Sequence, residues 1–102
     1  MRLIVLTIVT VVEGAVPAGK EAELEQAFKE AKQQAAPQGL LTSTLLRNVN
    51  QPQIYRIQTV WLSKEVLEKM RQTTATPKAF ELFQKVGAKA QLQVYEEVDS
   101  IP

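Results

Sequence analysis

RLIVLTIVTVVE, residues 2–13, is the stretch that decides the fold, because it is apolar at odd and even positions alike. Its many β-branched residues are typical of a β-strand. Successive strand residues point to opposite faces. One face would carry Leu3, Val5, Val9 and Val11, and the other Ile4, Leu6, Ile8 and Val12. A strand that is apolar on both faces is covered on both, so the sequence predicts a central strand here.

The rest of the chain alternates between helical and extended patterns. Apolar residues at helical spacing indicate amphipathic helices, and the turn residues at 48–52 indicate a hairpin between two strands. In chain order, the pattern predicts a helix at 20–36, strands at 40–49 and 53–62, a helix at 64–71, a further helix beginning near Pro77, and a strand at 89–98.

This β-α-β-β-α-β order, with the second helix broken in two, predicts an α+β fold of the ferredoxin-like kind. One antiparallel sheet would have its helices on one face, and one domain would span residues 1–102. Nothing else in the chain remains to cover the other face of the central strand. A second copy packed face to face would cover it, so we expect a homodimer whose two sheets close into a barrel.

Composition excludes several kinds of chemistry. The 102 residues include no Cys and no His, so disulfides, thiolate nucleophiles, Cys or His zinc sites and Ser-His-Asp triads are absent. The formal net charge of +1 provides no strong field for nucleic acid or a membrane surface. We therefore expect neither as a partner, and we expect no metal site, because the carboxylates at 96–99 form an ordinary solvent-facing run.

The first residues also imitate a short secretory signal, since Met1 and Arg2 precede an apolar run. The β-branched composition of that run favours a strand instead. Pro17-Ala18-Gly19 then leads directly into the predicted helix. We therefore expect the protein to be cytoplasmic.

Several short stretches resemble the antibiotic biosynthesis monooxygenase domain family. They are Pro17-Ala-Gly-Lys20, Gln38-Gly-Leu40, Leu46-Arg47-Asn48, Val60-Trp61-Leu-Ser63-Lys-Glu-Val-Leu67 and Thr76-Pro77. The stretch that contains Trp61 is the most specific. The resemblance spans about residues 3–98 and implies a dimeric α+β barrel, in agreement with the fold expected from the pattern.

The resemblance implies a pocket between the helices and the sheet of each subunit, with Trp61 in its wall. Some family members are cofactor-independent monooxygenases of quinols or anthrones, and some relatives degrade haem. This chain departs from the family where relatives often carry His, since Met70 and Lys78 stand there. Its first strand also lacks the pocket Asn of the haem-degrading relatives. The departures disfavour haem degradation, and the resemblance implies no cofactor.

Cofactor-free oxygenation needs an apolar pocket, a proton acceptor and a cation or donor near the developing oxyanion. The candidate catalytic residues are Trp61, Arg47 and Tyr55, and the candidate substrate-binding residues are Phe28, Met70, Lys78 and Phe80. Core packing also accounts for the aromatic residues, and solvation accounts for the Arg and the Lys. Tyr55 shares strand parity with Trp61, whereas Arg56 has the opposite parity.

Two functions from different classes remain open at this point. The first is a cofactor-independent monooxygenase that acts on a small aromatic or quinol-type substrate. The second is a non-catalytic dimeric barrel that binds a small apolar ligand or serves as a regulatory or assembly domain. The absence of His in the chain gives weight to the second.

Overall fold

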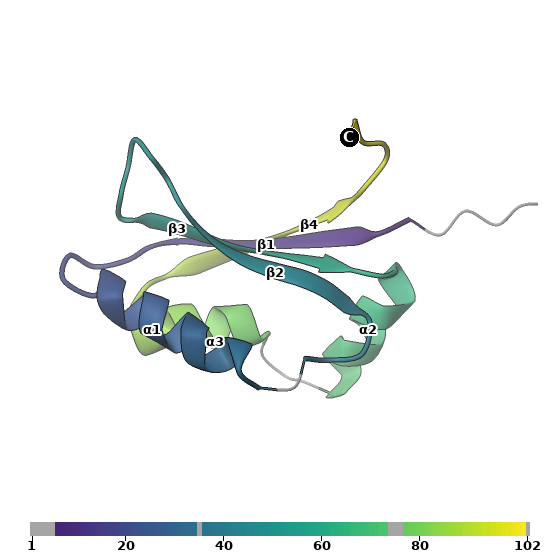
Figure 1. Ribbon diagram of the computed structural model, residues 1–102, viewed down its shortest axis with the longest axis horizontal. Coiled ribbons are helices and arrows are strands. Elements are labelled where there is room, and N and C mark those ends of the chain that lie inside the picture. Colours follow the sequence, from purple (N-terminus) through teal and green to yellow (C-terminus); the bar gives the residue numbers. More distant parts are fainter. Residues whose placement is uncertain (1–5, 35, 74–76, 102) are drawn as a thin grey trace, which may run out of the picture.

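A computed structural model describes residues 6–34, 36–73 and 77–101. Its seven elements form one sheet and a layer of three helices (Figure 1). In chain order they are β1 (Ile8–Ala15), α1 (Glu21–Lys32), β2 (Leu40–Arg47), β3 (Ile54–Trp61), α2 (Lys64–Thr73), α3 (Lys78–Lys85) and β4 (Ala90–Glu96).

The sheet is antiparallel and has the strand order β2-β3-β1-β4, so the doubly apolar strand β1 lies between two neighbours. All three helices lie on the same side of the sheet (Figure 1). The predicted ferredoxin-like arrangement is confirmed. In register, β1 runs from the Ile8–Trp61 pair to the Ala15–Ile54 pair of β3.

The largest differences from the predicted bounds are at β1 and at the end of α1, whereas the other elements begin and end within two residues of prediction. The first strand begins at Ile8 and continues to Ala15, and positions 2–5 of the predicted strand lie outside the described residues. Helix α1 ends at Lys32 rather than at residue 36. The N–H groups of Gln33 and Gln34 bond to carbonyls three residues back, which tightens the last turn. Pro37 then disfavours helical backbone at the residue before it.

The main core lies between the sheet and helices α1 and α3. Phe83 of α3 and Leu24 of α1 are fully buried against Val12 and Ile57 of the central strands. Gly14 permits this approach, because a Cβ there would stand 2.7 Å from the Lys89 carbonyl oxygen. A smaller cluster lies beneath α2, where Ile8, Trp61 and Leu67 pack together.

The other face of the sheet carries no described element. Its centre is apolar: Val11 is buried between its Cα partners Gln58 and Gln93, and Val9 and Val60 are half-buried. Leu46 and Tyr95 are exposed at its sides, 42% and 53% respectively. The tip of the β2–β3 hairpin and the C-terminal segment both curve to this side (Figure 1). The open apolar face expected from residues 2–13 is therefore present at Val9 and Val11 of the single chain, while positions 2–5 lie outside the described residues.

Among the described helices, none combines the length and the apolar character needed to cross a bilayer.

Candidate functional site

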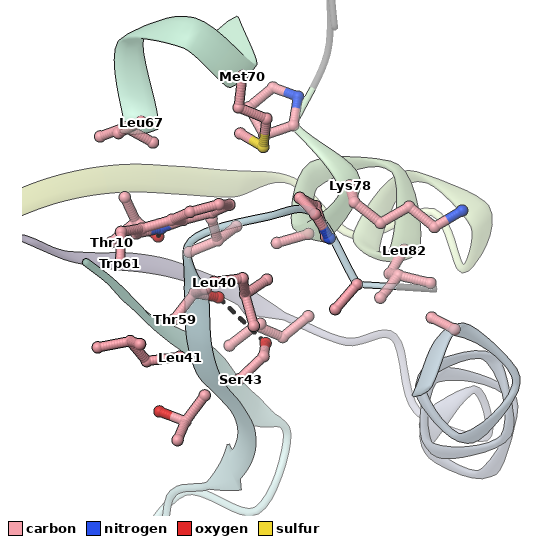
Figure 2. Close-up of a pocket in the computed structure, with 18 of the residues that line it drawn as sticks. Thr10, Leu40, Leu41, Ser43, Thr59, Trp61, Leu67, Met70, Lys78 and Leu82 are labelled. Atoms are coloured by element: carbon pink, nitrogen blue, oxygen red, sulfur yellow. Dashed lines mark hydrogen bonds between the residues drawn. The ribbon is translucent and has the colours of Figure 1, made fainter. Parts of the chain in front are cut away.

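A cavity of about 590 Å³ opens between the helices and the sheet. Strands β1 and β3 form its floor and β2 one wall (Figure 2). The three helices, the segment that follows α1 and Leu92 of β4 complete the lining. Apolar side chains dominate its lining: Val12, Phe28, Ala31, Leu40, Leu41, Ile57, Trp61, Leu67, Met70, Leu82 and Leu92. A cavity of this size and character can take a flat organic molecule of two or three rings.

Trp61 is placed in this cavity by the end of β3 and by the helix that follows. Gly39 has a positive φ of 89° beside it, and its Cα packs so closely on Val66 of α2 that a side chain has no room. Leu67 and Met70 of α2 lie near the ring (Figure 2). The indole N–H of Trp61 donates to Thr10 Oγ1 at 3.0 Å, which fixes the ring plane against β1.

Three hydroxyls cross the floor of the cavity in one row. Thr10 of β1 is the Cα partner of Thr59 on β3, which is in turn the partner of Ser43 on β2. The Ser43 and Thr59 hydroxyl oxygens are 3.0 Å apart and share a hydrogen bond. These groups are the polar part of an otherwise apolar floor.

The charged residues that line the cavity are all cations: Lys32, Arg71 and Lys78. No Asp or Glu belongs to the described lining. The Lys78 side chain runs along α3 away from Trp61 (Figure 2), and its ammonium lies 3.8 Å from Glu81. Within the described ranges, no group of three or more Asp or Glu residues is arranged to hold a metal ion.

Four of the seven predicted site residues line the cavity and three do not. Trp61, Phe28, Met70 and Lys78 all line the cavity. Phe80 instead packs against the main core.

Arg47 and Tyr55 are outside the described lining. They pair with each other in register at the opposite end of β3 from Trp61. Trp61 lies six positions after Tyr55 along β3, which corresponds to about 20 Å.

Tyr55 ties β3 to α1 at that far end. Its ring is almost completely buried, and its hydroxyl donates to Glu25 Oε2 at 2.6 Å. The Arg47 guanidinium stands 4.0 Å from the same carboxylate oxygen. Burial raises the pKa of Tyr55 above its usual value, and the hydrogen bond to Glu25 acts in the same direction, while Arg47 partly opposes both. The neutral phenol is therefore the form that the fold stabilises.

Replacing Tyr55 with Phe is expected to lower the free energy of unfolding at pH 7 by about 1–2 kcal/mol, because the bond to a charged acceptor is lost. The wild-type protein should also lose stability as the pH rises beyond about 10, where the unfolded tyrosine ionises more readily than the folded one. Tyr55→Phe should remove that part of the alkaline loss. Urea unfolding at pH 7 and 10.5 measures both effects.

Tyr95→Phe is the matched control, because that ring is half exposed on the open face. It should leave the free energy of unfolding at pH 7 and its decrease at pH 10.5 close to those of the wild type. An alkaline loss that is unchanged in Tyr55→Phe would contradict this role for Tyr55.

Sequence reasoning missed the hydroxyl row and the cations Lys32 and Arg71. Thr10 counts as a strand-forming residue by its β-branched shape, which hid its polar role. Its parity was informative, because it shares a face with Ile8 and Val12 and both are buried. A hydroxyl on a buried face requires hydrogen-bond partners.

Comparison with known proteins gives one family and several structures. The sequence profile of the family described as "Antibiotic biosynthesis monooxygenase" matches residues 7–86. No curated protein matches the chain significantly.

Three of the similar solved structures illustrate the range. SnoaB, a cofactor-independent oxygenase from Streptomyces nogalater, has a TM-score of 0.72 at 19% identity, over 94% of this chain and 97% of that one. The heme-degrading protein of Mycobacterium tuberculosis has a TM-score of 0.69 at 23% identity, over 97% and 99%. A conserved protein from Methanosarcina mazei has a TM-score of 0.64 at 16% identity, over 89% and 92%. At these identities the structures show a shared fold.

Proposed function

We propose that the chain, which belongs to the antibiotic biosynthesis monooxygenase family, oxidises a flat aromatic compound with O₂ and without a cofactor. The observation that carries this proposal is the cavity between the helices and the sheet. Its volume of about 590 Å³, its apolar lining and the ring of Trp61 suit two or three fused rings. The structural likeness to a cofactor-independent oxygenase supports it.

The chemistry must draw all its electrons from the substrate. An activated CH₂ group, such as that of an anthrone, loses a proton, and the resulting anion passes one electron to O₂. The two radicals combine as a peroxide. Loss of the second C–H proton with cleavage of the O–O bond then gives a carbonyl and water. One oxygen atom enters the product and the other leaves as water, so no separate reductant is needed.

The charges of the cavity favour the anion on which this route depends. Lys32 and Arg71 line it together with Lys78, whose ammonium lies beside Glu81, and no carboxylate belongs to the described lining. Cations near a bound acid favour its ionised form. The described lining also holds no carboxylate base, so the proton passes to hydroxide or water that enters from solvent. The rate is therefore expected to rise with pH until the bound substrate is ionised.

An oxygen electrode tests the activity with anthrone as substrate. We expect O₂ consumption above the protein-free rate, one O₂ for each anthraquinone formed, and a rate that increases between pH 6 and 8. Protein unfolded in urea and refolded by dilution should recover the rate, whereas protein kept unfolded should have none. Absence of consumption by protein that demonstrably binds anthrone would contradict the enzymatic proposal.

A second function is favoured by one specific observation, the absence of Asp and Glu from the described lining together with the absence of His from the chain. A site without a base can bind an aromatic ligand without transforming it. Binding of anthrone with no product would indicate this non-catalytic role, as a carrier or regulatory domain.

We further propose that two copies pack through their open sheet faces. Val9, Val11 and Val60 form an apolar centre there, and a persistent patch of this kind on a single chain favours association. The hairpin tip and the C-terminal segment rise around this face (Figure 1) and carry the exposed side chains Val49 and Ile101. A partner sheet would bury both the centre and these flanking residues.

A further inference from the structure

The floor of the cavity carries more polar groups than packing explains. Thr10 and Thr59 are only 8% and 6% exposed, yet their hydroxyls stand among apolar side chains. A buried hydroxyl costs free energy unless its hydrogen bonds are made. These two residues and Ser43 are Cα partners across three adjacent strands, so their hydroxyls form one continuous row.

Two hydroxyl hydrogens of this row are available to a ligand. The indole nitrogen of Trp61 can only donate, so Thr10 Oγ1 is the acceptor of their bond and keeps its own hydroxyl hydrogen. Within the described ranges, the bond from Trp61 is the one side-chain hydrogen bond of the Thr10 hydroxyl, and Thr10 accepts in it. Ser43 and Thr59 share one hydrogen bond, in which one hydroxyl donates and the other retains its hydrogen. Thr10 and the Ser43–Thr59 pair therefore each have one O–H to give.

We propose that this row binds the oxygen of an aromatic ketone or of its enolate. The assignment rests on the proposed function, because it names the residues that would hold the substrate oxygen in the same cavity. Thr10 and the Ser43–Thr59 pair donate to the substrate oxygen, while its rings lie against the apolar lining. Trp61 is a positioning residue: its N–H occupies an acceptor site of Thr10 and thereby turns the Thr10 hydroxyl into a donor.

The row favours a ligand that accepts hydrogen bonds. It offers hydrogen-bond donors, and no carboxylate of the described lining offers an acceptor. A hydrocarbon of the same shape would cover the buried Thr10 and Thr59 hydroxyls without accepting a hydrogen bond from them, and sites built to make hydrogen bonds reject such analogues strongly. A charged oxygen accepts stronger hydrogen bonds than a neutral one. The row therefore favours the enolate over the ketone, which is the form that reacts with O₂.

Calorimetric titration with two ligands of the same skeleton tests the row. Anthrone has a carbonyl where 9,10-dihydroanthracene has a CH₂ group. We expect the wild-type protein to bind anthrone at least tenfold more tightly. Thr59→Val and Thr10→Val should each reduce that ratio by about fivefold, whereas Thr10→Ser should keep it. Thr44→Val is the matched control, because Thr44 lies on the open face of the same sheet.

The ratio of the two affinities is informative even where a variant is less stable, because lost packing affects both ligands. A second readout is the carbonyl stretch of bound anthrone, which should lie at lower frequency in the wild type than in the Thr10→Val/Thr59→Val double variant. Equal affinities for the two ligands would overturn the proposed role of the row. So would an affinity ratio and a carbonyl frequency that are unchanged in the double variant.

The oxygen-electrode result distinguishes this inference from the proposed function. A tenfold preference for anthrone without O₂ consumption would overturn the proposed oxygenase activity and support the role of the row. O₂ consumption without a preference for anthrone would overturn only the role of the row. Failure of both ligands to bind would overturn both.

Discussion

Trp61→Ala is expected to unfold at clearly lower denaturant concentration than the wild type, with a loss of about 3 kcal/mol. Large aromatic residues truncated to Ala in a core cost about 3–5 kcal/mol. Trp61 is 5% exposed and packs with Ile8 and Leu67. One side of its ring borders the cavity, which places the expected loss near the lower limit. The substitution also deprives Thr10 of its hydrogen-bond donor.

The same variant should bind anthrone at least thirtyfold more weakly, because the ring that forms one wall is gone. Trp61→Phe is the matched variant: it keeps most of the apolar wall and removes only the N–H. It should unfold within about 1.5 kcal/mol of the wild type and lose part of the preference for anthrone over dihydroanthracene. Circular dichroism in urea reports the unfolding, since Trp61 is the only tryptophan. A Trp61→Ala variant with wild-type stability and affinity would contradict this placement of the ring.

Val60→Lys is expected to abolish the dimer and leave the fold of the single chain intact. Val60 is half-buried on the open face, opposite Val9 in register. A lysine at position 60 can extend so that its ammonium reaches water when the chain is alone. In a face-to-face dimer two such ammoniums would be buried together, and an uncompensated buried charge costs about 3–5 kcal/mol. The dimer dissociation constant should therefore rise by at least a hundredfold.

Light scattering on a sizing column measures the molar mass of each protein at micromolar concentration and so separates dimer from monomer. Val94→Lys is the matched control: Val94 is 47% exposed and faces the helix side of the sheet, as the partner of Thr10. We expect a dimer for the wild type and for Val94→Lys, and a folded monomer for Val60→Lys. A monomeric wild type, or a Val60→Lys protein that stays dimeric, would refute the packing of open faces.

The fold could be predicted from the sequence because local and global signals agree. The β-branched run at residues 2–13, apolar at both parities, predicted a central strand, and the turn residues Asn48–Pro52 predicted a hairpin. The observed sheet has β1 between two neighbours and β2 paired with β3. The end of α1 could not be placed as well, since residues 33–36 continue its helical composition. A tighter turn at Gln33 and the constraint of Pro37 end the helix earlier.

The site was less predictable, because parity says which face a residue shares and not where along the strand it lies. Tyr55 and Trp61 share a face, yet Tyr55 meets Glu25 of α1 at one end while Trp61 meets Thr10 near the other. Helix α1 decides this difference, and its position over the sheet is a tertiary property. The role of Thr10 depends on a partner 51 residues away, which no local pattern reports.

The most direct test of the central claim is the mass of the product formed from anthrone under ¹⁸O₂. We predict anthraquinone that carries one ¹⁸O atom, formed faster with the wild-type protein than without protein and at a reduced rate with Trp61→Ala. Anthraquinone formed no faster than in buffer alone, or formed faster but without the label, would contradict a monooxygenase that inserts one atom of O₂ in this cavity.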